Sequence, residues 1–155
     1  MKLKIGDPVP SVLLKDQNKQ DFNTDHFKGK KPFVIYFYPK DFTSQCTREA
    51  CSFRDKYEEF RELGAEVIGI SSDSEESHSE FIEKYKLPFI FLSDREKIGR
   101  QAFGVRPTFL GLLAGRETFV FDENGILRNR FNNLLGSPHT ENALKVMKEM
   151  SKKEN

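Results

Sequence analysis

Two cysteines, Cys46 and Cys51, are the side chains of this sequence best suited to covalent chemistry. Cys46 follows a strand-like apolar run at 33–38 and comes just after Thr43 and Ser44, residue types that cap helices. If either residue caps a helix, Cys46 lies in its first turn, where unpaired backbone N–H groups and the helix dipole favour a thiolate. The thiolate is the nucleophilic form of cysteine. The pattern therefore predicts a reactive cysteine at position 46.

The five-residue offset between Cys46 and Cys51 restricts how the two thiols can bond to each other. In a regular helix, ~1.5 Å of rise and ~100° of rotation per residue separate their Cα atoms by about 8–9 Å. A disulfide generally needs a separation below about 7 Å. A Cys46–Cys51 disulfide thus requires the helix to unwind locally. The simpler alternative, that either cysteine is only a small buried packing residue, stays open at this point.

Other uses of the cysteines fit their spacing less well. A zinc site needs three or four ligands, whereas His26, His78 and His139 are scattered along the chain. We therefore expect no metal site. The cysteines also lack the Cys-x-x-Cys spacing of dithiol oxidoreductases, so thioredoxin-type dithiol exchange is a weaker match.

The composition predicts one globular domain without a strong electrostatic partner. The chain has 155 residues, enough for a single domain over 1–155, and 32% of them are charged with a net charge of +1. This balance predicts neither nucleic-acid nor membrane attraction, and no apolar run approaches the roughly 18–20 residues that span a bilayer. The opening residues lack the apolar stretch of a signal peptide, so we expect a cytoplasmic protein without a structural disulfide framework.

The pattern along the chain predicts an α/β fold in which strands and helices alternate. Apolar or alternating segments predict strands at 12–15, 20–22, 33–38, 65–71, 89–92, 117–121 and 126–131. Amphipathic segments predict helices from about 44 to 64, at 74–85, from 94 to 103 and at 139–152. We expect a central mixed sheet with flanking helices and an N-terminal hairpin, mainly parallel but with an antiparallel edge from a late hairpin. A loop is expected at 132–138, and 105–115 has no clear period, so its conformation stays unassigned.

The residues around the cysteines resemble a known active-site motif. Pro39-Lys-Asp-Phe-Thr43-Ser-Gln-Cys46 is similar to Pro-x-x-x-Thr-x-x-Cys of the peroxiredoxins. The continuation to Cys51 resembles the Q-type peroxiredoxins, the bacterioferritin comigratory protein group. The likeness extends over the chain through the Gly-Asp-x-x-Pro opening, the AEVIGISSDS stretch at 65–74, the segment 88–94 and the segment 116–125.

This resemblance implies a thioredoxin-like fold and a cofactor-free, monomeric thiol peroxidase for hydrogen peroxide and organic hydroperoxides. It implies that Cys46 is the peroxidatic residue, which attacks the peroxide and becomes a sulfenic acid. It implies that Cys51 is the resolving residue, which forms an intramolecular disulfide with Cys46. A dithiol donor, typically thioredoxin in this family, would then reduce the disulfide.

The resemblance also implies roles for four further residues. Thr43 would hold the peroxide or the thiolate, and Pro39 would shield the sulfur from water. Arg116, placed before a Thr-Phe-Val-Phe strand, would stabilise the thiolate and the charge on the leaving oxygen. Glu49, one turn after Cys46, would orient an arginine or, alternatively, face solvent.

Two departures from the family pattern concern the pocket. Ser44-Gln45 stands where Pro-Gly is usual in the family. The segment 105–115 does not follow the sequence pattern expected before Arg116. Two other functions remain alternatives: a thiol–disulfide exchange protein that acts on partner proteins, and a redox sensor that oxidises at Cys46 without peroxidase turnover.

Overall fold

The computed structural model describes residues 3–105, 115–132 and 137–153. Its elements follow one another as β1 (Leu13–Asp16), β2 (Asp21–Asn23), β3 (Phe33–Phe37), α1 (Ser44–Glu62), β4 (Glu66–Ser71), α2 (Glu75–Tyr85), β5 (Ile90–Ser93), α3 (Ile98–Phe103), β6 (Glu117–Phe121), β7 (Leu127–Phe131) and α4 (Ser137–Lys153). Within this part of the chain the strands form one seven-stranded sheet in the order β2-β1-β5-β4-β3-β6-β7. The predicted α/β fold with an N-terminal hairpin is confirmed.

The sheet is mixed rather than mainly parallel. β3, β4 and β5 run parallel to one another, with α1 and α2 as the crossover connections between them. The hairpins β1–β2 and β6–β7 join on either side, β1 antiparallel to β5 and β6 antiparallel to β3. The expected mixed sheet is confirmed, whereas the expectation that it is mainly parallel holds only for the three central strands. Alternating strands and helices do not reveal the direction in which a hairpin docks onto a sheet edge.

β3 is the strand that leads into the cysteine helix. All five of its residues are buried, as expected for a strand covered on both faces. Its register is fixed on both sides, because Phe37 pairs with Ile70 of β4 and with Glu117 of β6. The ladder ends there, and Pro39, which has no N–H to donate, follows two residues later. The strand thus delivers the following loop to the edge where β4 and β6 also have their site-facing ends.

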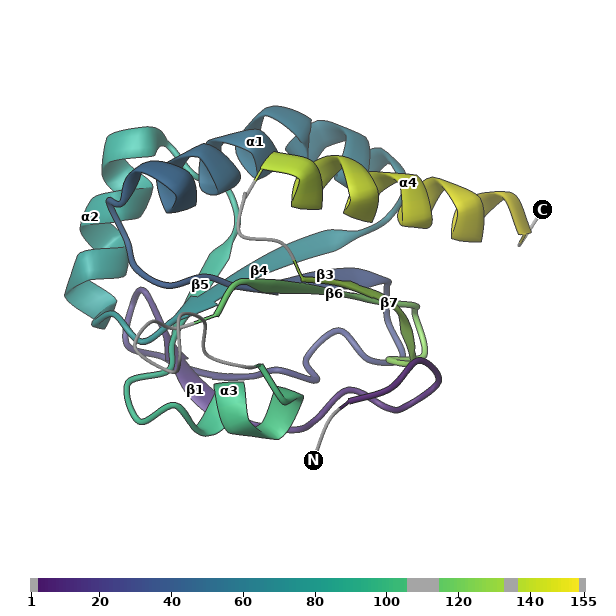
Figure 1. Ribbon diagram of the computed structural model, residues 1–155, viewed down its shortest axis with the longest axis horizontal. Coiled ribbons are helices and arrows are strands. Elements are labelled where there is room, and N and C mark those ends of the chain that lie inside the picture. The colour runs from purple at the N-terminus through teal and green to yellow at the C-terminus, as the bar shows by residue number, and fades with distance from the viewer. Residues whose placement is uncertain (1–2, 106–114, 133–136, 154–155) are drawn as a thin grey trace.

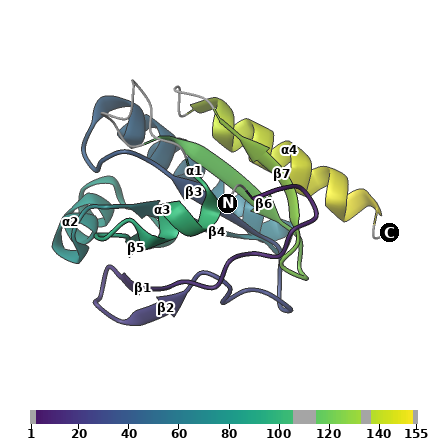
Figure 2. The ribbon, with the colours of Figure 1, turned by 60° about the horizontal axis from the view of Figure 1, so that its bottom comes forward.

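Helices cover both faces of the sheet (Figure 1). α1 and α4 lie across one face with α2 beside them, whereas the short α3 lies against the other face. The first face packs Tyr36 of β3 against Phe53 and Phe60 of α1. The opposite face packs Phe37 against Phe103 of α3, together with apolar residues of the N-terminal segment. Figure 2 brings this second face forward and shows the β1–β2 hairpin along one edge of the sheet.

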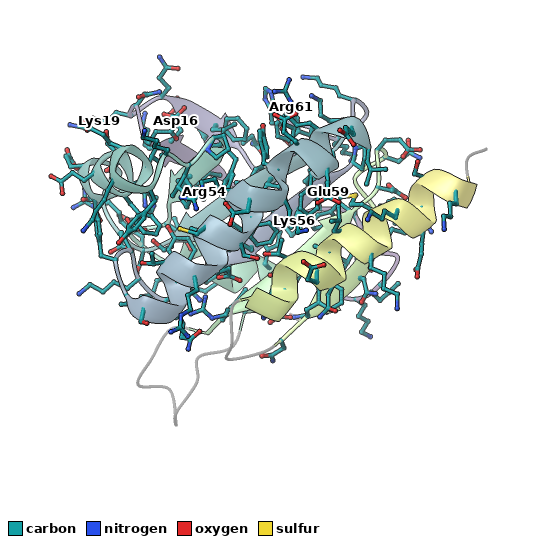
Figure 3. All side chains as sticks on the ribbon, turned by 90° about the horizontal axis from the view of Figure 1, so that it is seen from above. Asp16, Lys19, Arg54, Lys56, Glu59 and Arg61 are labelled. Carbon is teal, nitrogen blue, oxygen red and sulfur yellow. The ribbon has the colours of Figure 1, made fainter. Side chains whose placement is uncertain are left out.

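α1 and α4 run side by side over the sheet (Figure 3). Glu59 of α1 lies 3.7 Å from Lys148 of α4, and Ala143, Leu144 and Met147 of α4 are buried in the core beneath it. The predicted amphipathic face of α4 is therefore confirmed. The helix begins at Ser137, inside the segment that was expected to be a loop.

The ends of the helices agree with the sequence signals to different degrees. α1 is closed by Gly64 at φ +75°, a left-handed conformation that glycine adopts without steric cost. α3 begins at Ile98 and not at Asp94, the predicted start. Asp94 still acts as a cap, because its carboxylate accepts hydrogen bonds from the backbone amides of Gly99 and Arg100 at 2.8 and 2.9 Å.

Part of the sequence prediction lies outside the described residues, namely most of 105–115 and part of 132–138. Among the helices that the structure does describe, none combines the length and the apolar character needed to cross a bilayer.

Candidate active site

The first turn of α1 carries Cys46. The helix begins at Ser44 with Thr43 in the N-cap position, so Cys46 is its third residue, as the sequence predicted. No acidic residue stands in this first turn to offset the positive end of the helix dipole. The expectation of a side-chain cap is wrong for Thr43, because its hydroxyl donates instead to the Lys40 carbonyl at 2.8 Å.

The Cys46 sulfur is buried against a guanidinium. Arg116 Nη2 donates to Cys46 Sγ at 3.2 Å, and Arg116 Nη1 donates to Glu49 Oε1. All three side chains are at most 5% exposed. Glu49 lies one turn after Cys46 on the same helix, so one carboxylate can hold the arginine that touches the sulfur. The structure brings together three of the six residues that the sequence singled out.

The register of the sheet explains why Arg116 reaches the sulfur. Arg116 immediately precedes β6, whose first residue Glu117 pairs with Phe37 at the end of β3. Arg116 therefore lies at the same sheet edge as the loop that runs from β3 to Cys46. The segments are 70 residues apart in sequence but share one end of the sheet.

Burial dominates the electrostatics of the Glu49–Arg116 pair. Burial raises the pKa of Glu49 to about 8 from an ordinary value of 4.5, while the charge of Arg116 and its hydrogen bond act in the opposite direction. Burial alone would lower the pKa of Arg116, but the charges of Glu49 and Cys46 raise it further than burial lowers it. Arg116 thus remains a fixed positive charge beside the thiol.

A buried histidine lies on the other side of Glu49. His139, in the first turns of α4, has its Nδ1 3.8 Å from Glu49 Oε2 and 2.6 Å from the hydroxyl of Thr118 on β6. His139 and Thr118 are both fully buried. The sequence patterns identified neither His139 nor Thr118 as a residue of this site. Their contacts with the site depend on how α4 docks, which no local pattern predicts.

A second polar network holds the loop between β3 and α1. The buried carboxylate of Asp41 accepts hydrogen bonds from the Tyr38 hydroxyl at 2.5 Å and the Ser77 hydroxyl at 2.8 Å, and it lies 2.7 Å from His78 Nδ1. His78 Nε2 donates to the Leu92 carbonyl at 3.0 Å. Asp41 thereby connects the active-site loop to α2 and β5. This connection was not predicted, although Asp41 lies within the motif.

The backbone of the same loop adopts an unusual conformation at Phe42. Its φ of +65° lies in the left-handed region that residues with a side chain rarely adopt. Its ring packs edge-on against Phe81 of α2 at 5.1 Å between centroids. Contacts with α2 thus hold both Asp41 and Phe42, and with them the approach to Cys46.

Cys51 lies within the continuous α1 helix and is half-buried. Both cysteines are free thiols. Burial raises the pKa of Cys51, the charge of Arg54 opposes this, and the charge of Asp55 adds to it. The helix therefore presents Cys51 as a protonated thiol held apart from Cys46.

Pro39 is half-buried at the bend after β3, and Thr43 is exposed. Among the described residues, no three His, Cys, Asp or Glu side chains are grouped as a metal ion would require. The arrangement is suited to thiol chemistry, because it combines a buried sulfur, a guanidinium and a second thiol on the same helix.

Comparison with known proteins agrees with this chemistry. The model of the AhpC/TSA family matches residues 5–130. The chain belongs to this family. Its members are thiol-dependent peroxidases, so the expected enzyme class is confirmed.

The relatives of this AhpC/TSA member point to the Q-type group. It is 46% identical over 150 residues to chloroplastic peroxiredoxin Q of Sedum lineare, covering 96% of this chain and 80% of the relative. It is 45% identical over 148 residues to that of Arabidopsis thaliana, covering 95% and 68%. The resemblance to Q-type peroxiredoxins is therefore confirmed.

Solved structures of peroxiredoxins share the fold. BcpB, a peroxidoxin of Mycobacterium tuberculosis, superposes with a TM-score of 0.87 at 32% identity and covers 96% of this chain and 98% of its own. A mutant of PrxQ from Xylella fastidiosa superposes with a TM-score of 0.88 at 25% identity, covering 97% and 99%. The predicted thioredoxin-like fold is thereby confirmed.

Proposed function

We propose that this peroxidase reduces hydrogen peroxide and organic hydroperoxides through Cys46, with Cys51 as the resolving residue and thioredoxin as the reductant. The observation that carries the proposal is the contact of Arg116 Nη2 with Cys46 Sγ at 3.2 Å, in a site where Glu49 holds the same guanidinium. A fixed positive charge beside the sulfur stabilises the thiolate and then the oxygen that leaves.

In the first step, the Cys46 thiolate attacks one oxygen of the peroxide and the O–O bond breaks. The sulfur gains that oxygen and becomes a sulfenic acid, and the other oxygen leaves as an alkoxide or hydroxide that takes a proton to give an alcohol or water. Arg116 is placed to stabilise the charge on the leaving oxygen. Pro39 would limit access of water, and the Thr43 hydroxyl, which donates to Lys40, could accept a hydrogen bond from the peroxide.

In the second step, the Cys51 thiol condenses with the sulfenic acid, forming the disulfide and releasing water. Because both cysteines lie within α1, the first turn of the helix must unwind for the sulfurs to meet. A dithiol then reduces the disulfide by exchange, becomes oxidised itself, and returns both cysteines to thiols.

The range of substrates and the cellular setting are further parts of this proposal. The Xanthomonas campestris bacterioferritin comigratory protein, whose solved structure is 28% identical with a TM-score of 0.82, is described as having alkyl peroxide reduction activity. This supports organic hydroperoxides as substrates here. We further propose one domain over 1–155 acting as a monomer in the cytoplasm, as expected from the sequence, whereas the curated plant relatives are chloroplastic.

The experiment that tests the proposal is a peroxidase assay coupled to thioredoxin and its reductase. We expect turnover with hydrogen peroxide and with a bulky hydroperoxide, complete loss in Cys46→Ser, and strong loss in Cys51→Ser that an external thiol restores. One equivalent of peroxide should give an intramolecular disulfide by intact mass.

The same assay separates the alternatives. Peroxidase activity that survives Cys46→Ser would contradict the proposed mechanism. Oxidation of Cys46 without turnover would favour the redox sensor, and reduction of a protein disulfide without a peroxide step would favour the exchange protein. A Cys46 sulfinic acid with Cys51 still free would leave Cys51 as a packing residue.

A further inference from the structure

Arg100, on α3, is a second arginine buried beside the active site. It is 5% exposed, and none of the described carboxylates lies within ion-pair distance of it. A buried guanidinium without a paired carboxylate is costly to the folded state. Its hydrogen bonds go to backbone carbonyls instead, with Nη2 donating to Tyr38 at 2.6 Å and Nη1 donating to Gly115 at 2.8 Å.

The positions of these two carbonyls are informative. Tyr38 immediately precedes Pro39 and the loop to Cys46, and Gly115 immediately precedes Arg116. Both carbonyls lie just beyond the Phe37–Glu117 pair, the last residue pair of the β3–β6 ladder. One planar guanidinium thus connects the segment that carries the nucleophile with the segment that carries its arginine, where the sheet itself no longer holds them together.

Arg100 is itself held at a defined position. Asp94 accepts hydrogen bonds from the Gly99 and Arg100 backbone amides, which fixes the start of α3. The guanidinium lies over the Phe37 ring at 5.7 Å from its centroid. A side chain at Gly99 would meet Asp94, because an added Cβ would come within 3.1 Å of Asp94 Oδ2. The Arg100 side chain therefore extends from a helix, α3, whose start is fixed.

The charge of Arg100 also acts on the site. Burial lowers the pKa of Arg100, whereas the charges of Asp94, Cys46 and Tyr38 raise it and that of Arg116 lowers it. Two explanations of Arg100 are therefore possible, electrostatic stabilisation of the thiolate or positioning of the two segments. The contacts with two carbonyls favour positioning. We call these two hydrogen bonds, from one guanidinium to the Tyr38 and Gly115 carbonyls, the clamp. The clamp needs the forked geometry of a guanidinium, whereas charge stabilisation does not.

We propose that Arg100 is a positioning residue for the peroxidase reaction, because its hydrogen bonds to the Tyr38 and Gly115 carbonyls set the placement of Arg116 relative to Cys46. The proposal rests on the proposed function at Cys46 and deepens it. Arg100 touches neither substrate nor sulfur in this role. It acts through the two backbone segments.

The test compares two substitutions in a Cys51→Ser background, where Cys46 is the one remaining thiol. Arg100→Met removes both the charge and the clamp, and Arg100→Lys keeps the charge but cannot bind both carbonyls in the same plane. Arg95→Met serves as the matched control, because it also removes an arginine, but one whose side chain is 64% exposed. Arg95 Nη1 lies 3.6 Å from Glu75 Oε2. Circular dichroism checks that each variant folds. If Arg100→Met does not fold, the comparison of Arg100→Lys with the parent protein still tests the proposal.

Two rate constants are measured for each variant. Oxidation of Cys46 by hydrogen peroxide needs Arg116 at the leaving oxygen. Alkylation of Cys46 by iodoacetamide has no such need when it is followed at a pH at which the thiol is ionised in every variant. We expect both Arg100 variants to slow oxidation about 10- to 100-fold, as a misplacement of catalytic groups by ~1 Å can. The rate of alkylation should change by less than about threefold. The control should match the parent in both rates.

Two results would overturn the inference. Full rescue of oxidation by Arg100→Lys would assign the effect to charge alone, and oxidation at the parental rate in both variants would leave Arg100 a structural residue. Failure of the proposed function is distinguishable, because it would appear as slow oxidation of the parent protein itself.

Discussion

At the scale of single residues, the Glu49–Arg116 pair shows how a positive charge is kept beside a buried sulfur. Arg116 would cost free energy if it were buried alone, and Glu49 offsets that cost through its direct contact. Burial also disfavours the charged form of Glu49, whose pKa it raises to about 8. His139 lies 3.8 Å from the second carboxylate oxygen of Glu49 and is itself hydrogen-bonded to Thr118, so the pair belongs to a network that reaches α4 and β6.

The raised pKa of Glu49 leads to a prediction about stability and pH. Between pH 4.5 and about 8, the folded protein keeps a proton that the unfolded chain releases. The unfolded state then binds fewer protons, so the free energy of unfolding falls as pH rises, by at most about 1.4 kcal/mol per unit. Glu49→Gln removes this titration and should show a flatter dependence.

Urea unfolding under reducing conditions, from about pH 5 to about pH 8, measures this difference. We expect the stability of the wild type relative to Glu49→Gln to decline across that range. A difference that stays constant with pH would contradict the assignment of a raised pKa to Glu49.

The site residues also show where sequence reasoning succeeds. Cys46, Arg116 and Glu49 could be predicted because motif spacing and a family resemblance identify them. The contacts of His139, Asp41 and Arg100 could not, because they join distant segments: the hydrogen bonds His139–Thr118, Asp41–His78 and Arg100–Tyr38 link residues 21, 37 and 62 positions apart. Such contacts follow from docking of helices onto the sheet and leave no periodic signal in the sequence.

At the scale of elements, the loop between β3 and α1 is restrained by contacts with several other parts of the fold. Asp41 fixes it to α2, and its backbone N–H also donates to Asp73 at 2.8 Å, beyond the end of β4. A restrained loop favours the helical form of the first turn of α1, in which Cys46 faces Arg116. The disulfide requires the opposite, a first turn that opens.

Weakening this restraint should therefore change the two chemical steps differently. Asp41→Asn keeps the size of the side chain but removes a buried charge that accepts several hydrogen bonds, at a cost of about 1–3 kcal/mol. We expect Cys46 oxidation to slow about tenfold, the change that ~1.4 kcal/mol produces. Disulfide formation from the sulfenic acid should not be slowed.

Quenched-flow mass spectrometry resolves both steps in one reaction. Asp21→Asn is the control, because Asp21 is an exposed carboxylate on the β1–β2 hairpin that pairs with the exposed Lys15. Equal slowing of both steps in Asp41→Asn would argue against a specific restraint on the loop.

At the scale of the whole molecule, the core that supports the site is packed closely around β4. Gly69 lies in that strand between Tyr36 of β3 and Phe91 of β5. A Cβ added there would lie 2.8 Å from Cε2 of Phe91 and 3.0 Å from Cζ of Tyr36. Glycine is needed at this position for space, because the two aromatic rings approach the backbone.

Gly69→Ala should destabilise the protein by about 1–3 kcal/mol, the usual cost of overpacking a core. The double variant Gly69→Ala/Phe91→Leu should lose less than the sum of the two single variants, since removal of the ring relieves the contact. Urea unfolding of the four proteins gives the coupling energy. Additive losses would show that the strand shifts to accommodate the methyl group.

The overall architecture was predictable where periodicity and turn residues agreed. The hairpins, the buried central strands and the four helices were each predicted within a few residues. The docking of the N-terminal hairpin was not, because β1 pairs antiparallel with β5 through contacts that link distant parts of the chain. Local patterns indicate which residues are buried, but the neighbours of a strand depend on the whole sheet.

The position of Glu49 between the two cysteines on α1 has a consequence for the order of events. If the unwinding that joins Cys46 to Cys51 extends from the first turn through residue 49, Glu49 is carried away from Arg116 with it. The peroxide site and the disulfide would then be mutually exclusive states of one segment. An oxidised molecule could not accept a second peroxide until a dithiol restored the helix, which would protect the resolved sulfur from further oxidation.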